Sequence, residues 1–181
     1  MLTWILVAIV VLVALYLIFT YNGLIRSKNR VQEAESDIDV QLKRRYELIP
    51  NLIETVKGYA KHEKELFEKV TAERSNLITG STDQKLEASN QLTETLKSLF
   101  AVAENYPDLK ANQNFLQLQN DLTDTQDKIM AAQRFYNGNV RDFNTKLQVF
   151  PTNLYARMMG FTAFNFFEAG ETEKENVNVK F

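Results

Sequence analysis

Apolar residues recur at intervals of three and four through the stretch from Arg26 to Leu77. They are Leu42, Tyr46, Ile49, Ile53, Val56, Ala60, Phe67, Val70 and Leu77, and Val31, Ala34 and Ile38 extend the series backward. This spacing places apolar side chains on one face of a helix and is typical of helices that pack side by side. Only Glu63 and Arg74 interrupt that face. We therefore expect a long first helix near residues 24–79.

Pro50 lies inside this expected helix. A proline in a helix removes one backbone donor and clashes with the preceding turn. We expect a kink near residues 46–51, with a break as the alternative. The apolar spacing continues unshifted across the proline, which favours the kink.

Two further stretches carry helical spacing, near residues 83–104 and 108–149. Before the first, Gly80 suits a helix end, and Ser81 with Gln84 fits a capping box. Before the second, a proline marks a tight connection between antiparallel helices.

A short fourth helix near residues 153–160 completes the expected elements. The sequence thus predicts an all-α fold, in which a transmembrane helix continues into an elongated antiparallel helical bundle. That bundle has three long helices plus a short fourth, with shallow crossing angles.

The chain begins with an apolar run from Leu2 to Phe19 that contains no charge. Extended to Tyr21, the run has about the twenty residues needed to cross a bilayer. Trp4, Tyr16 and Tyr21 suit the two interfaces. The alternative is a cleaved signal peptide, but no basic segment precedes the run and no small-residue cleavage site follows it. We expect a retained transmembrane anchor over residues 1–22.

Basic residues indicate the orientation of this span. Arg26, Lys28 and Arg30 follow it, and none precedes it. Cationic flanks tend to stay in the cytoplasm, so we expect the N-terminus outside and the long C-terminal domain in the cytoplasm.

The chain after the third expected helix is strongly apolar, with Met158, Met159, Phe161, Phe164, Phe166 and Phe167. We interpret it as a lid over one end of the bundle, and the alternative is a docking surface for a partner or a membrane interface. Residues 168–181 form a polar, acidic tail. The expected organisation is an anchor over 1–22, a helical bundle domain over 23–167 and the tail.

Composition excludes several function classes. The net charge is −2, so the chain lacks the basic field needed to bind nucleic acid. It contains no cysteine and one histidine, His62. No Glu-x-x-His pairs of a di-metal bundle occur. We predict no catalytic, cofactor-binding or metal-binding residues.

Two polar clusters stand out on the expected helices. One is Lys43, Arg44, Arg45 and Tyr46, one turn before the proline, and the other includes Arg134, Tyr136 and Asn137. Charged groups on packed helices are usually solvated or paired between helices. We interpret both clusters as inter-helix contacts, with recognition of a partner as the alternative.

Five stretches carry a family resemblance. They are YNGL at 21–24, DIDVQLKRRYELIPNLIETVKGYAKHE at 37–63, YPDLKANQNFLQLQ at 106–119, RFYN at 134–137 and FNTKLQVFPTNLYA at 143–156. With these motifs the chain resembles the LemA family over nearly its whole length. Gln126 and Gln133 depart from the Glu and Arg that the resemblance leads us to expect. The resemblance implies a bacterial protein with an N-terminal membrane anchor and a long helical bundle, and it implies no activity.

Two functions follow as hypotheses. The first is a non-enzymatic scaffold or adaptor in the bacterial cell membrane, held in the bilayer through residues 1–22 and bound to other membrane or cytoplasmic proteins. The alternative is an enzyme with a carboxylate or metal site between helices. We also expect a homo-oligomer, because Val31, Ala34 and Ile38 extend beyond the expected reach of the third helix. The competing possibility is that Met158 to Phe167 folds back over this stripe and leaves a monomer.

Overall fold

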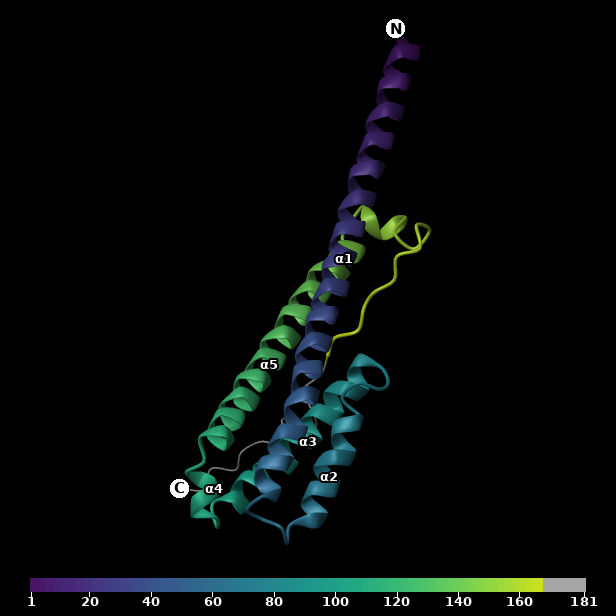
Figure 1. Cartoon of the computed structure of the whole chain (residues 1–181). Coiled ribbons are helices and arrows are strands. Elements are labelled where there is room, and N and C mark those ends of the chain that lie inside the picture. Colours follow the sequence, from purple (N-terminus) through teal and green to yellow (C-terminus); the bar gives the residue numbers. More distant parts are fainter. Residues whose placement is uncertain (168–181) are drawn as a thin grey trace, which may run out of the picture. The chain divides into compact units, whose positions relative to one another are not determined.

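The computed structural model describes residues 1–167, and the predicted tail lies outside this part. All regular structure in the described part is helical, so the all-α prediction is confirmed (Figure 1). The elements are α1 (Leu2–Lys57), α2 (Lys64–Ser75), α3 (Thr82–Ala103), α4 (Pro107–Lys110), α5 (Gln113–Gln148) and the 3₁₀ turn η1 (Thr152–Leu154). The chain divides into two compact units. The first combines residues 1–35 with 134–166, and the second contains residues 36–133.

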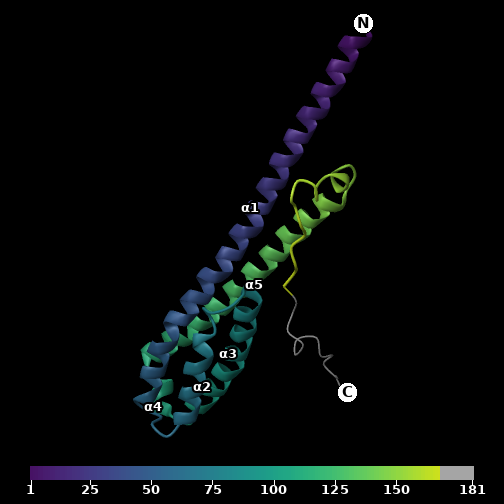
Figure 2. The ribbon, with the colours of Figure 1, turned by 90° about the vertical axis from the view of Figure 1, so that its right-hand side faces the viewer.

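In the second unit, α1 ends at Lys57 and α2 begins at Lys64. The single helix expected to reach residue 79 is therefore wrong. The chain reverses after Gly58, where the N–H groups of Tyr59 and Ala60 both donate to the carbonyl of Val56. Ala60 is fully buried inside the reversal, so the apolar spacing runs through a turn that breaks the helix. Figures 1 and 2 show α2 beside α3 and the end of α1.

Helix α1 continues through Pro50 without a break. Proline has no N–H to offer the carbonyl four residues earlier, which belongs to Tyr46. Arg74 on α2 takes that role, since its Nε donates to the Tyr46 carbonyl at 2.7 Å. The Arg74 guanidinium also lies 3.6 Å from the centre of the Tyr46 ring. One of the two polar interruptions of the apolar face thus joins α2 to α1.

Helix α3 begins with the predicted capping box. The Ser81 hydroxyl accepts from the N–H of Gln84, and the Gln84 side chain accepts from the N–H of Ser81 at 2.9 Å. Gly80 before it has a φ of 92°, which favours glycine. Along its length α3 packs against α2.

The third long helix is interrupted near its start, where α4 ends at Lys110 and α5 begins at Gln113. Asn112 lies in the gap, and its side-chain oxygen accepts from the N–H groups of Asn114 at 2.9 Å and Phe115 at 3.1 Å. Asparagine offers the backbone an alternative to helical bonds. The expectation of one helix over residues 108–149 is therefore wrong at its first turn.

In the first unit, the start of α1 is long and apolar enough to cross a membrane, with a mean hydropathy of 2.9 and none of that window buried. Farther along α1, Val31 and Ala34 are fully buried, and so is Ile38 in the second unit. The exposed stripe expected at these three positions is wrong. Self-association stays a prediction, but without that stripe to support it.

The chain after α5 turns back onto α5 within the first unit. Phe143 on α5 contacts the rings of Phe161 and Phe164, with ring centres 6.3 and 5.3 Å apart. Asn144 exchanges two hydrogen bonds with the backbone of Phe164, at 2.8 and 3.0 Å. Phe161 is buried, whereas Met158 is 87% exposed. The covering role expected for this segment therefore applies to Phe161 and not to Met158.

The fourth helix expected over residues 153–160 is wrong. Only Thr152–Leu154 forms a 3₁₀ turn, and single turns follow to Gly160. A short helix needs an apolar face packed against something. Leu154 and Met158 are exposed instead, so no such face is formed.

Candidate functional site

Arg45 is the centre of the polar interior of the second unit. Its side chain is 2% exposed. One terminal nitrogen, Nη1, donates to the Ser89 carbonyl at 3.0 Å, to the Ser89 hydroxyl at 2.6 Å and to the Gln126 side-chain oxygen at 2.6 Å. The other, Nη2, donates to the Thr93 hydroxyl at 2.8 Å. The guanidinium therefore joins α1 to α3 and α5.

The acceptors around Arg45 are neutral oxygens. Burial lowers the pKa of Arg45 to about 10, because desolvation disfavours the charged form. At pH 7 the group is still charged. The Nε–H is also buried and makes no hydrogen bond within the described part of the chain. Because no carboxylate accepts from the Arg45 guanidinium in the described part of the chain, its charge is stabilised by the dipoles of the Ser89, Thr93 and Gln126 side chains.

Arg44, the neighbour of Arg45 in the predicted cluster, points to the surface of α5. It lies 3.2 Å from Asp124 and 3.8 Å from Asp121. Lys128 donates a hydrogen bond to Asp124 at 2.9 Å and is the main cause that lowers the pKa of this carboxyl. Each of these exposed ion pairs contributes little to stability. Together they connect α1 to α5 at the surface, as Arg45 does in the interior.

Lys43 and Tyr46 line a surface groove of about 340 Å³ in the second unit. The groove is bordered by Asp39, Lys43, Tyr46, Glu47, Leu77, Ile78 and Lys85. Lys85 crosses it to Asp39 at 2.8 Å. Lys43 is exposed and Ile78 is 47% exposed. The groove thus combines both signs of charge with an apolar wall.

The second predicted cluster lies on α5 in the first unit. Tyr136 is buried, and its hydroxyl donates to the carbonyl of Asn165 at 3.3 Å. Asn137 is half-buried and Arg134 is exposed. Tyr136 therefore holds the returning segment, which is not helical at Asn165, and Arg134 faces solvent.

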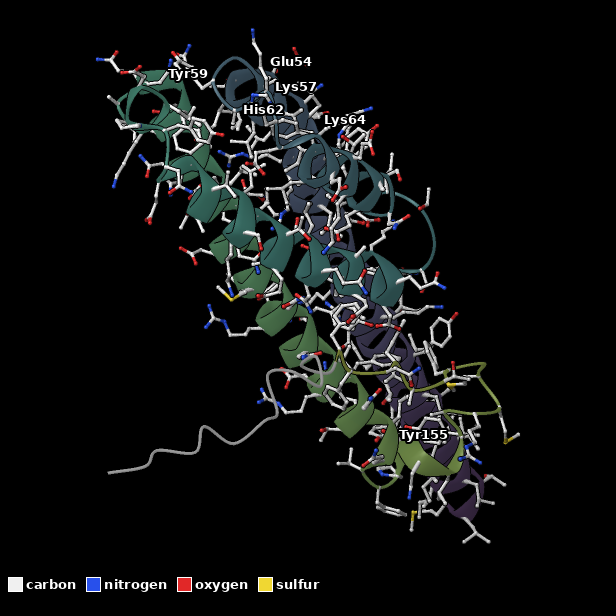
Figure 3. All side chains as sticks on the ribbon, turned by 90° about the horizontal axis from the view of Figure 1, so that it is seen from below. Glu54, Lys57, Tyr59, His62, Lys64 and Tyr155 are labelled. Atoms are coloured by element: carbon white, nitrogen blue, oxygen red, sulfur yellow. The ribbon has the colours of Figure 1, made fainter. Side chains whose placement is uncertain are left out.

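Among residues 1–167, no three His, Cys, Asp or Glu side chains are placed to hold a metal ion. His62 is exposed in the turn between α1 and α2, where Figure 3 shows it near Tyr59 and Lys64. Glu73 on α2 is a half-buried carboxylate, 15% exposed, which accepts from the Thr95 hydroxyl at 3.0 Å. The Lys69 ammonium lies 3.9 Å from the same carboxylate oxygen, so Glu73 is held by a hydroxyl and an ammonium group.

Of the acceptors of Arg45, the sequence drew attention to Gln126 alone, as a departure from the family resemblance, and not to Ser89 or Thr93. Ser89 lies on the face of α3 that Leu86, Leu92 and Leu96 share, three residues after the first of these. A hydroxyl at an apolar position of a helix marks a buried polar contact, and that signal was available. The sequence offered no signal that Ser89 would pair with Arg45, which lies 44 residues earlier.

The described part of the chain is helical, and its first segment is apolar and unburied. These features define a class of helical proteins suited to membrane anchoring. A model of the LemA family matches residues 34–181. Protein LemA of Metamycoplasma hominis is 32% identical over 159 residues, which cover 87% of this chain and 73% of that protein. The chain belongs to the LemA family.

More distant relatives share most of the chain. Magnetosome protein MamQ of Magnetospirillum gryphiswaldense is 22% identical over 86% of this chain and 68% of its own length. Magnetosome protein MamQ 2 of Paramagnetospirillum magneticum is 23% identical over the same shares. None of these three relatives bears the name of an enzyme.

Proposed function

We propose that the protein is a non-catalytic scaffold or adaptor, anchored in the bacterial cell membrane by the start of α1. The observation that carries this proposal is the Arg45 network. Its terminal nitrogens and their acceptors bind one another across three helices, which supports a structural role for the buried polar groups. The absence of enzyme names among the relatives agrees with this role.

The anchor crosses the bilayer once, with the N-terminus outside and the rest of the chain in the cytoplasm. Arg26, Lys28 and Arg30 follow the apolar segment and support this orientation. A scaffold on the cytoplasmic side meets membrane proteins and cytoplasmic proteins alike.

The groove beside Lys43 is the surface that suits a protein partner best. Asp39, Glu47 and Lys85 supply charges of both signs, while Leu77 and Ile78 supply apolar contact. Protein interfaces combine an apolar centre with a polar rim. A nucleic acid or a single small anion would not use both signs of charge.

A photo-crosslinking amino acid at Lys43 tests this proposal in native membranes, with the same amino acid at exposed Ser98 on α3 as the matched control. We expect discrete adducts with other proteins at Lys43 that are absent or much weaker at Ser98. Adducts with a second copy of the chain would support the predicted homo-oligomer. Equal, diffuse labelling at both positions contradicts a partner site in this groove.

A further inference from the structure

An apolar turn follows α5 and leaves its largest side chains in the open. In this turn, residues 149–158, Phe150 is 79% exposed, Leu154 is 66% exposed and Met158 is 87% exposed. Thr152 and Ala156 between them are buried. The turn is thus held by its small residues and presents its large apolar residues outward. Exposed apolar groups gathered in one segment mark an interaction surface.

The turn lies beside the end of the apolar segment of α1, within the first unit. The phenol of Tyr155 is next to the side chains of Tyr16 and Thr20 on α1, although within residues 1–167 its hydroxyl makes no hydrogen bond of ordinary geometry. Figure 3 shows Tyr155 against α1. The ring of Phe161 meets that of Tyr21 edge to face, with centres 5.7 Å apart.

This position places the turn at the depth of the membrane interface. Tyr21 ends the apolar run, and Tyr16 lies five residues before it, about 7.5 Å deeper along a helix. Tyr155 of the turn lies beside Tyr16, and Phe161, three residues after the turn, meets Tyr21, so the turn lies at the layer where headgroups meet acyl chains. Apolar and aromatic side chains at that depth are favourably placed in lipid.

The charge around the turn matches an anionic lipid surface. The first unit has seven basic and three acidic side chains, whereas the whole chain has 21 basic and 23 acidic residues. Arg30, Arg141 and Lys146 border one groove of about 450 Å³ between α1 and α5, which Asp142, 3.2 Å from Arg141, also lines. Basic residues close to a bilayer are attracted to anionic headgroups.

We propose that residues 149–158 are a second membrane contact, whose Phe150, Leu154 and Met158 side chains enter the same leaflet that α1 leaves. This inference rests on the proposed anchoring by α1 and adds a contact to it. We infer that the bilayer contacts this turn because the turn lies beside the membrane-spanning segment and basic residues surround it.

The full chain contains no cysteine, so a single Leu154→Cys variant can carry the fluorophore NBD at that position. The protein is reconstituted into vesicles of phosphatidylglycerol and phosphatidylcholine. We expect blue-shifted emission that is quenched by brominated acyl chains and protected from aqueous iodide. Leu116→Cys on α5, 43% exposed in the second unit, is the matched control and should show the opposite quenching.

Two variants test the cause of the shift. Phe150→Gln with Met158→Gln should reduce the blue shift at position 154, whereas Val40→Gln with Ile78→Gln, also exposed apolar residues, should not. Vesicles of phosphatidylcholine alone should give a smaller shift, and an equal shift would overturn the attraction to anionic headgroups.

Vesicle flotation separates this inference from the anchor itself. If the protein floats with the vesicles while iodide quenches NBD at position 154 as fully as at position 116, the second contact is overturned and the anchor stands. If the protein does not float, both are overturned. A blue shift that disappears when the ratio of protein to lipid is lowered would assign the turn to contact between copies and overturn the lipid contact.

Discussion

Pro50 and Arg74 act on one atom, the carbonyl oxygen of Tyr46. We predict that Arg74→Met lowers the free energy of unfolding by about 1–3 kcal/mol, because a carbonyl loses a charged donor. In a Pro50→Ala background the introduced N–H donates to the same carbonyl, so Arg74→Met should cost less. A double-mutant cycle by urea unfolding in detergent, followed by circular dichroism, measures this coupling. Arg141→Gln, at an exposed arginine, is the control, and equal costs in both backgrounds would contradict the shared role.

Gln126 is one of the neutral acceptors of the buried Arg45 charge. Replacing it with an acid should make the free energy of unfolding depend on pH. Gln126→Glu should stabilise the fold at pH 7 by about 1–2 kcal/mol, since Arg45 gains a charge-assisted hydrogen bond. Arg45 would hold the pKa of the introduced carboxyl below its unfolded value of about 4.3. The gain is therefore present above that value and is lost as pH falls through the folded pKa.

Unfolding midpoints of the Gln126→Glu variant and the natural chain, measured from pH 7 to pH 3, check this expectation. Gln126→Leu serves as the comparison, because it keeps the volume and removes the acceptor. It should destabilise at every pH. A Gln126→Glu gain that persisted unchanged at pH 3 would show that the carboxyl is not paired with Arg45.

At the scale of elements, Asn112 decides where α5 begins. Asn112→Ala removes the acceptor for two N–H groups and should cost about 1 kcal/mol. Its amide also donates to the Tyr59 hydroxyl at 3.0 Å, so Tyr59→Phe should reproduce only a smaller part of that cost. Hydrogen exchange at Asn114 and Phe115 measures the effect. Unchanged protection at both amides in Asn112→Ala would contradict the cap.

The helical spacing was sufficient to predict the element types and several of their ends, because local rules govern them. The capping box of Ser81 and Gln84 could be predicted because its two residues are only three positions apart in the chain. The reversal at Gly58 was missed because Ala60 keeps the apolar spacing while the backbone turns. Arg45 was recognised as part of a polar cluster, but Ser89 and Gln126 lie far away in sequence, and only the packing of helices brings them together.

At the scale of the whole molecule, the orientation of the span can be read from two single cysteines. A cysteine inserted directly after Met1 should react with a membrane-impermeant maleimide on intact cells, because it precedes the span on the outer side. Ser98→Cys, at an exposed position of α3, should react only after lysis. The opposite pattern would place the long C-terminal part outside the cytoplasm and overturn the orientation inferred from Arg26, Lys28 and Arg30.

The buried charge of Arg45 also has a consequence in time. Its acceptors follow 44, 48 and 81 residues later, and at synthesis rates of about 5–20 residues per second the ribosome needs roughly 4–16 s to reach the last of them. During that interval the apolar start of α1 has already emerged, while Arg45 gains nothing by leaving water. We therefore expect the nascent chain to stay open behind the apolar segment, and burial of the arginine to wait until all three helices have been made.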